Sequence, residues 1–178
     1  MNPVDQLKNF IDEAVIWRGD ISLKRNQYLI VQGEVNTNLY YVKEGTLRAY
    51  VQDGFEEHTI RLAYPENLIV SLDSYISEKP TSLYIQALKK CELQYVTKAD
   101  FMKLVESKPE VMNLWQFMLE QLILQQFERE RDILTSSPKE RYERVLARSP
   151  QVFQEIPHKH IASYLRMSPE TLSRLKKS

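Results

Sequence analysis

Three side chains near the end of the sequence have the types and spacing to recognise polar groups on a partner molecule. Glu170, Ser173 and Arg174 stand at i, i+3 and i+4, which puts a carboxylate, a hydroxyl and a guanidinium on one face of a helix. Lys176 and Lys177 follow directly. Such a face is either ordinary solvated surface or a binding surface. The surrounding elements of the chain are needed to distinguish between the two.

The helix that carries this face is short and follows a second short helix. Ser168 suits its N-cap, Pro169 its first position, and Leu172 and Leu175 form one apolar stripe. The segment HKHIASYL predicts the preceding helix, and RMS predicts a tight turn between the two. Two short helices joined by a three-residue turn, the second basic and exposed, are typical of a helix-turn-helix.

Charge is unevenly distributed along the chain. The whole sequence has 24 basic and 24 acidic residues, but residues 139–178 carry nine Lys or Arg against four Glu, a net charge of +5 that leaves −5 for the rest. This asymmetry favours a polyanionic partner for the last segment, with a solvated basic face as the alternative. His158 and His160 lie two residues apart and so on different helix faces, which predicts phosphate or solvent contacts rather than metal ligands.

Several kinds of chemistry are excluded by what the sequence lacks. All four glycines lie in the first 54 residues, so neither a P-loop nor a dinucleotide-binding glycine pattern is present. A single cysteine, Cys91, excludes an intramolecular disulfide and a cluster held by several thiolates. We find no nucleophile–base pair and no metal constellation, so we expect no catalytic residues, no metal and no cofactor. Without a signal peptide or a bilayer-spanning apolar run, we expect a cytoplasmic protein with no membrane partner.

The remaining chain falls into two parts that differ in the spacing of their apolar residues. Apolar and polar residues alternate in NLYYVKEGTLRAYVQDGFEEHTIRLAY, where Asp53-Gly54 marks a hairpin, and SLYIQALKKCELQYVT predicts two further strands. Short antiparallel strands with turns about every ten residues predict a sandwich or rolled barrel. Residues 3–16 predict a short helix before these strands.

From about residue 98 the pattern is helical and is broken once, at Pro109. Residues 110–134 predict one long helix whose first turns are apolar nearly all round. Because a small sheet domain covers only one side of such a helix, we expect a second copy of the helix on the other side, with a helix wholly buried in its own domain as the alternative. Ser137 and Glu140 predict a capped helix that continues to about residue 148, and VFQEIP is expected to be extended.

From end to end, the chain resembles the CRP/FNR family of bacterial transcription regulators. The resemblance rests on QGEVNTNLYYVKEGTLRAY with its spaced glycines, on the long helix, and on IPHKHIASYLRMSPETLSR. It implies an α+β protein: an antiparallel β-roll (double-stranded β-helix or jelly-roll) at residues 1–109, a long dimerisation helix at 110–136, and a C-terminal winged-helix-like helix-turn-helix domain at 137–178. It further implies a homodimer that binds a palindromic site in double-stranded DNA, with RNA polymerase as a partner.

The segment ETLSR matches the Glu-x-x-Ser-Arg recognition pattern of the FNR branch. The DNA-binding residues that this match, the helix cap and the basic flank imply are Ser168, Glu170, Thr171, Ser173, Arg174, Lys176 and Lys177. Arg166 occupies the turn position where relatives usually have glycine, and a left-handed conformation there costs on the order of 1 kcal/mol. The printed sequence stops directly after this helix, so we expect no wing strand beyond it.

A second departure concerns the cyclic-nucleotide site. Relatives that bind cyclic nucleotides carry Gly-Glu, whose carboxylate takes the ribose hydroxyl, and then an arginine that neutralises the phosphate. Here Val70-Ser71 and Thr81-Ser82 stand at those places, so no charge remains to hold the phosphate unless Lys79 moves in. We therefore expect no specific binding of cyclic AMP or cyclic GMP. The remaining polar residues Ser71, Asp73, Thr81 and Ser82 either line a pocket for a different small molecule or are solvated strand ends.

Four functions remain after these steps. A DNA-binding transcription regulator, controlled by an unidentified small ligand or by none, fits every segment. A cyclic-nucleotide-responsive regulator fits the fold but lacks the residues, and a regulatory interaction module that no longer binds DNA fits the strand-rich part. An enzyme fits least well. Haem or cluster sensing is also weakly supported, since the strand-rich part offers one cysteine and His58.

Overall fold

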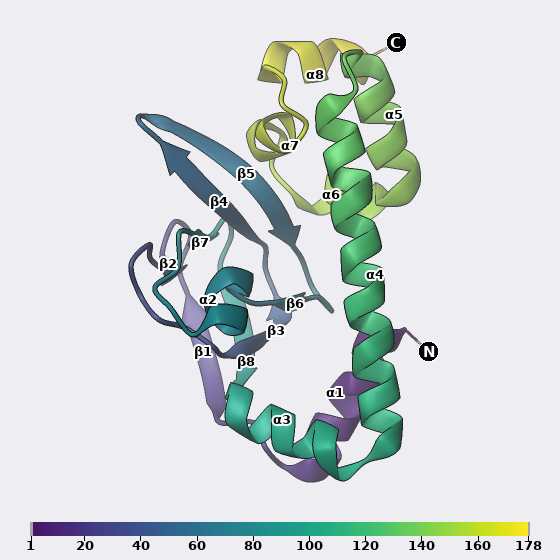
Figure 1. Ribbon diagram of the computed structural model, residues 1–178. Coiled ribbons are helices and arrows are strands. Elements are labelled where there is room, and N and C mark those ends of the chain that lie inside the picture. Colours follow the sequence, from purple (N-terminus) through teal and green to yellow (C-terminus); the bar gives the residue numbers. More distant parts are fainter. Residues whose placement is uncertain (1, 178) are drawn as a thin grey trace.

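The computed structural model describes residues 2–177. Within them the strands form two four-stranded antiparallel sheets, ordered β1-β8-β3-β6 and β2-β7-β4-β5, and the long helix α4 runs along their side (Figure 1). The strands are β1 Gly19–Leu23, β2 Tyr28–Ile30, β3 Leu39–Glu44, β4 Leu47–Asp53, β5 Glu56–Ala63, β6 Leu68–Ile69, β7 Tyr84–Ala87 and β8 Cys91–Val96. The helices are α1 Pro3–Ala14, α2 Leu72–Ser77, α3 Lys98–Ser107, α4 Pro109–Leu134, α5 Pro138–Arg148, α6 Pro150–Glu155, α7 His158–Tyr164 and α8 Pro169–Leu175.

The space between the two sheets is filled by apolar side chains from both. Val42 and Leu93 come from one sheet and Leu47 and Ile85 from the other, and none of them is exposed. The β4–β5 hairpin turns at Gly54, as predicted, with Asp53 paired to Glu56. The predicted sandwich or rolled barrel is therefore confirmed.

Gly45 makes the turn by which the chain passes from one sheet to the other. It joins β3 to β4 with a φ of +87°, and a Cβ atom placed there would lie 2.1 Å from the carbonyl oxygen of Lys90. Any side chain at this position would therefore collide with backbone, in addition to the strain of a left-handed conformation. This steric requirement explains why glycine stands at position 45 of the sequence.

The first half of α4 packs against α1 and α3 in a second apolar cluster. Leu7, Ile11, Phe101 and Val111 are fully buried there, and the ring of Phe101 meets Trp115 edge-on at 4.9 Å between centroids. The helix has 26 residues, about 39 Å at 1.5 Å per residue, which confirms the predicted long helix. Among residues 2–177, no helix is both long and apolar enough to cross a bilayer.

The C-terminal helical region has its own apolar cluster. Val145, Ile161, Leu165 and Leu172 are buried in it, together with Leu88 from the β7–β8 connection. The prediction of an extended VFQEIP segment is wrong, because Pro150–Glu155 forms the helix α6. Pro150 suits the first helical position, where its missing N–H is not needed, so it begins a new helix as well as ending the previous one.

Candidate nucleic-acid interface

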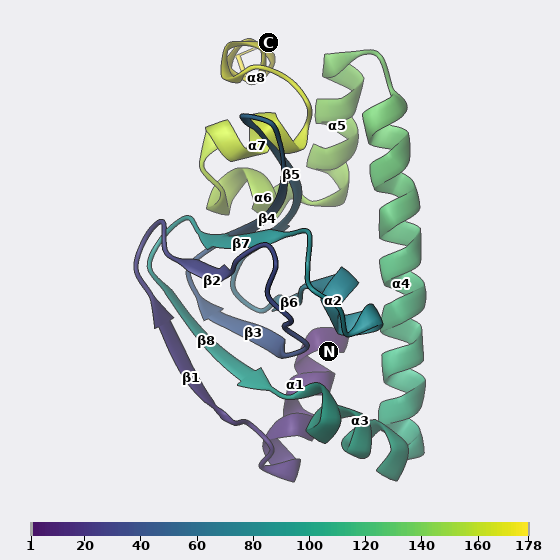
Figure 2. The same cartoon turned by 60° about the vertical axis from the view of Figure 1, so that its left-hand side comes forward.

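The three polar side chains of the recognition face are exposed on α8. Glu170, Ser173 and Arg174 all face solvent, whereas Leu172 is fully buried and Leu175 is half-buried. Helix α8 lies at one end of the molecule, with α7 on one side of it and α5 between it and α4 (Figure 2). The face is therefore free to meet a large partner while its opposite side is anchored in the core.

The start of α8 is fixed by its cap. Ser168 Oγ accepts a hydrogen bond from the Thr171 backbone N–H at 3.1 Å and lies 3.1 Å from the Thr171 hydroxyl. Thr171 is thus half-buried and bonded within the cap rather than free on the recognition face. The backbone N–H of Glu170 and the Ser168 hydroxyl lower the pKa of the Glu170 carboxyl, so it is an anionic acceptor at neutral pH.

One buried arginine fixes the turn before α8. Arg166 has a φ of 52°, the left-handed conformation expected from the sequence. Arg141, which is 9% exposed, donates to the carbonyl oxygens of Leu165 at 2.9 Å and Arg166 at 3.1 Å, and also to those of Thr135 and Ser136. A single guanidinium therefore joins the end of α4 to the turn that orients α8.

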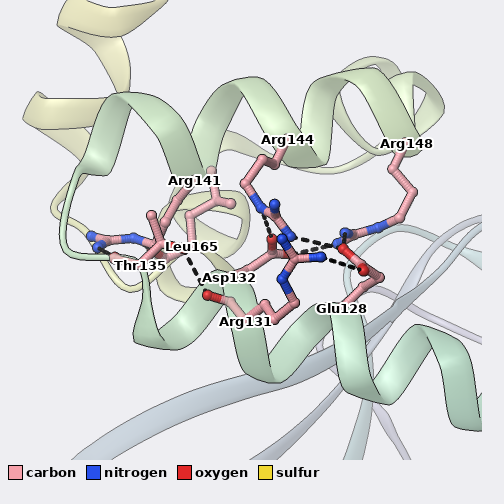
Figure 3. A network of polar contacts seen from close by, with 8 residues as sticks. All are labelled: Glu128, Arg131, Asp132, Thr135, Arg141, Arg144, Arg148 and Leu165. Atoms are coloured by element: carbon pink, nitrogen blue, oxygen red, sulfur yellow. Dashed lines mark hydrogen bonds and ion pairs between the residues drawn. The ribbon is translucent and has the colours of Figure 1, made fainter.

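An ion-pair network joins α4 to α5 (Figure 3). The side chain of Asp132 is 1% exposed and accepts from Arg144 Nε at 2.8 Å and from Arg148 Nη2. Glu128 lies one turn earlier on α4 and accepts from Arg144 Nη2 at 2.7 Å, with Arg148 3.6 Å away. Because charge-assisted hydrogen bonds depend on orientation, this network fixes the angle between α4 and the C-terminal helices.

These contacts change the interpretation of the basic C-terminal segment. Arg141, Arg144 and Arg148 are three of its nine basic residues, and their charges are used inside the molecule. The excess of positive charge therefore arises partly from packing, and the six other basic residues of this segment, all exposed, are what remain for a partner. These are Lys139, Lys159, Arg166, Arg174, Lys176 and Lys177.

The two histidines have different surroundings, and the prediction for one of them is wrong. His160 is 8% exposed, and burial together with the nearby Arg48 and Lys159 lowers its pKa to about 4, so it is a neutral core residue rather than a phosphate or solvent contact. His158 is exposed, and its Nε2 lies 2.6 Å from Lys176 Nζ. Of the two neighbouring lysines Lys176 and Lys177, it is Lys176 that makes this contact with His158.

Helix α7 is attached directly to the sheet. Ser163 Oγ accepts from the Thr59 backbone N–H at 3.2 Å and donates to the Glu57 carbonyl oxygen at 3.3 Å, so α7 is hydrogen-bonded to β5. Burial of the apolar cluster around Leu88 and Ile161 adds to this attachment. The sheet, the long helix and the recognition face therefore form one connected unit.

The four candidate ligand-binding residues lie together, but they satisfy one another. Asp73 accepts from Thr81 Oγ1 at 2.7 Å, Ser71 Oγ at 3.1 Å, and both the backbone N–H and the hydroxyl of Ser82 at 2.8 and 3.0 Å. Although burial alone would raise it, the hydrogen bonds from Ser82, Thr81 and Ser74 lower the pKa of Asp73 to about 2. The Asp73 carboxylate thus accepts the hydrogen bonds that the N–H and hydroxyl donors of this segment could otherwise give to a ligand.

The second side of α4 is apolar and exposed. Ile123 and Phe127 lie one turn apart and each is 65% exposed, and Leu134 is 75% exposed two turns further along. Leu122 instead faces the sheet and is half-buried. A row of large exposed side chains on one helix face is typical of an interface with another chain.

Comparison with known proteins identifies the family to which this arrangement belongs. Residues 20–108, half of the chain, match the cyclic nucleotide-binding domain family, and the chain therefore belongs to that family. No curated protein matches the sequence.

Solved structures show which regulators share the fold. The catabolite activator protein of Thermus thermophilus is 23% identical, with a TM-score of 0.61 over 99% of this chain and 85% of that one. A CooA mutant from Carboxydothermus hydrogenoformans (16% identity, TM-score 0.72, 93% and 77% covered) and FixK2 from Bradyrhizobium japonicum (16%, 0.72, 89% and 82%) are also similar. The α+β fold and the resemblance to CRP/FNR regulators are thereby confirmed.

Proposed function

We propose that this protein is a DNA-binding transcription regulator that acts as a homodimer on a palindromic site. The observation that carries the proposal is the capped, exposed helix α8, whose face presents Glu170, Ser173 and Arg174. Arginine can donate two hydrogen bonds to O6 and N7 of guanine, and a carboxylate can accept from N4 of cytosine in the major groove. Ser168, Lys176 and Lys177 are assigned to the DNA backbone and Thr171 to the cap that supports them.

The second element of the proposal is a parallel dimer formed along α4. Two-fold symmetry would place the two copies of α8 on successive turns of the same DNA face, about 34 Å apart. The apolar face around Ile123 and Phe127 supports this arrangement, because isolated protomers rarely expose such a row. We accordingly assign residues 1–109 to a sensor domain, 110–136 to the dimer helix and 137–178 to a helix-turn-helix domain, in a cytoplasmic protein that contacts RNA polymerase.

A cyclic-nucleotide-responsive regulator is the alternative that family membership alone would favour. The donors at Thr81 and Ser82 are bound to the Asp73 carboxylate, and no arginine stands at the place of the phosphate. A second anion at this place would be repelled by the first. These contacts favour a regulator that does not respond to cyclic AMP or cyclic GMP.

Replacing Arg174 with alanine tests the recognition face. We expect the affinity for a palindrome selected from random DNA to fall by roughly 1–3 kcal/mol, with preference relaxed at one base pair in each half-site. Fluorescence anisotropy on the selected duplex and its single-base variants measures both effects. Lys177→Ala is the matched control, since loss of a backbone contact should weaken binding to all sequences alike and lower the salt slope by about one. Unchanged affinity in Arg174→Ala would mean that this face is only solvated surface.

A further inference from the structure

Helix α7 meets the β4–β5 hairpin in a junction that includes hydrogen bonds as well as apolar contacts (Figures 1 and 2). The Thr59 N–H donates to Ser163 Oγ at 3.2 Å, and the two hydroxyl oxygens lie 3.1 Å apart. His160 stands three residues before Ser163 and is 8% exposed. Because residues three apart share a helix face, His160 belongs to the side of α7 that meets the hairpin.

The sheet side of this junction already contains a buried cation. Arg48 of β4 is 6% exposed, and its guanidinium carbon lies 4.1 Å from the centre of the Tyr50 ring. It donates to the Glu57 carboxylate of β5 at 2.6 Å and to the Gln86 side chain of β7 at 2.8 Å. The Glu57 carboxylate is therefore already paired with one positive charge.

The surroundings of His160 favour its neutral form. Burial, and then the charges of Arg48 and Lys159, lower its pKa to about 4. Arg25 in the β1–β2 connection acts in the same direction, and Glu57 acts against it. On the other elements packed around α7 the ionisable side chains have partners of their own. They are Lys176 with His158, Glu155 with Lys89, His58 with Glu56, and Arg61 and Arg129 with Tyr164.

A positive charge on His160 is incompatible with the closed junction. It would add a second buried cation to that of Arg48, and the one carboxylate of Glu57 would have to serve both. Water can stabilise the imidazolium only when α7 leaves the hairpin. We propose that His160 makes this junction acid-sensitive, so that protonation of its ring releases α7 from the β4–β5 hairpin. The hydrogen bond between Thr59 and Ser163 opens in the same step.

The sign of the pH dependence follows from the proton affinities of the two forms. The ring binds a proton with a pKa of about 4 in the closed junction, and with the ordinary value of about 6.5 once it is in water. The closed form thus binds fewer protons, and its advantage is lost as the pH falls from about 6.5 towards 4. Between about pH 7.5 and 5.5 the ratio of open to closed form should rise about tenfold.

Opening of the junction has a consequence for the recognition face. Helix α7 directly precedes the turn and α8, so its release from the sheet removes one of the contacts that orient α8. Affinity for DNA is then expected to fall at acid pH. This consequence rests on the proposed function, whereas the opening itself does not.

The backbone amide of Thr59 gives a direct measurement of the junction. Its N–H donates across the junction, so its hydrogen exchange, measured by NMR and divided by the intrinsic rate at each pH, reports the ratio of open to closed form. The full chain is compared at about pH 7.5 and 5.5, a range in which histidine is the side chain that ordinarily titrates. The variants are His160→Gln and two controls, His58→Gln and His158→Gln, which together remove each histidine of the sequence in turn.

We expect protection of the Thr59 amide to fall about tenfold between these two pH values in the wild type and in both controls, and by less than about twofold in His160→Gln. Protection that is equal at the two pH values in the wild type, or a tenfold loss that persists in His160→Gln, overturns the proposal.

A second measurement does not depend on how the His160→Gln variant folds. The ring resonance of His160 in the wild type should keep its neutral position down to about pH 6, where a ring in water would be mostly protonated. A ring that is half protonated at about pH 6.5 while the Thr59 amide stays protected contradicts the proposal. No DNA is present in either measurement, so their outcome is independent of the proposed function.

Discussion

Replacement of both Ile123 and Phe127 with glutamate is expected to convert the protein from a dimer into monomers. Each side chain is 65% exposed in the single chain, and burying an isoleucine or phenylalanine contributes about 1.5–3 kcal/mol. The variant loses this burial twice and places two carboxylates opposite two identical ones across the symmetry axis. We expect the dimer dissociation constant to rise by at least about two orders of magnitude, measured by analytical ultracentrifugation. Affinity for the palindrome should fall with it.

The control for this variant is Phe55→Glu. Phe55 lies at the tip of the β4–β5 hairpin and is fully exposed, so it tests the same chemical change away from α4. Its dimer dissociation constant should equal that of the wild type. A wild-type protein that sediments as a monomer at micromolar concentration would contradict the proposed dimer.

Asp132→Asn is expected to lower the free energy of unfolding by about 3 kcal/mol, the lower end of the range for breaking a buried ion pair. The Asp132 side chain is 1% exposed and neutralises two guanidinium groups, those of Arg144 and Arg148. Both arginines keep contact with water and with Glu128, which limits the loss. Urea denaturation measures the change, and it is a large share of the 5–15 kcal/mol typical of a folded domain.

Glu128→Gln is the comparison for Asp132→Asn. It removes a partly exposed charge from the same ion-pair network, whereas Asp132→Asn removes a buried one. The Glu128 side chain is 38% exposed, so its ion pairs should contribute only about 0–1 kcal/mol. We expect Asp132→Asn also to weaken DNA binding, because the angle between α4 and α8 depends on the network, whereas Glu128→Gln should leave binding nearly unchanged. Equal losses of unfolding free energy in the two variants would contradict the explanation that burial makes the ion pairs of Asp132 contribute more than those of Glu128.

The parts of the fold that follow local rules could be predicted from the sequence. Caps at Ser137 and Ser168 and the hairpin at Gly54 each leave a short-range pattern, and each is present in the structure. The long helix was recognisable for the same reason. Its two-sided apolar pattern also indicated the exposed face, because a single sheet can cover only one side. The alternation along β3 and β4 is not matched by burial, because residues 39–42 and 47–50 are buried in succession.

Features that depend on contacts between distant segments could not be found in this way. His160 lies on a helix whose exposed and buried sides are set by β5, which is about a hundred residues earlier in the sequence. The helix α6 is only six residues long, too short for periodicity to distinguish it from an extended segment. Arg61 and Arg129 belong to strand and helix patterns that give no sign that both side chains line one cavity between β5 and α4.

The α4–α5 network did leave a signal in the sequence. Arg141, Arg144 and Arg148 are spaced three and four residues apart, and Glu128 and Asp132 lie four residues apart on the preceding helix. Complementary charged faces on consecutive helices indicate a contact between them. The composition of the basic segment alone does not distinguish this internal role from contact with a polyanion.

The proposed regulator is tested most directly by the ratio of two affinities. Wild-type protein is titrated against a palindrome selected from random DNA and against the same duplex with both half-sites scrambled, at one fixed salt concentration near 0.15 M. We expect binding of the palindrome to be at least about a thousandfold tighter, with two protomers on each duplex. Equal affinity for the two duplexes, or no binding to either, would contradict a role in sequence-specific DNA recognition.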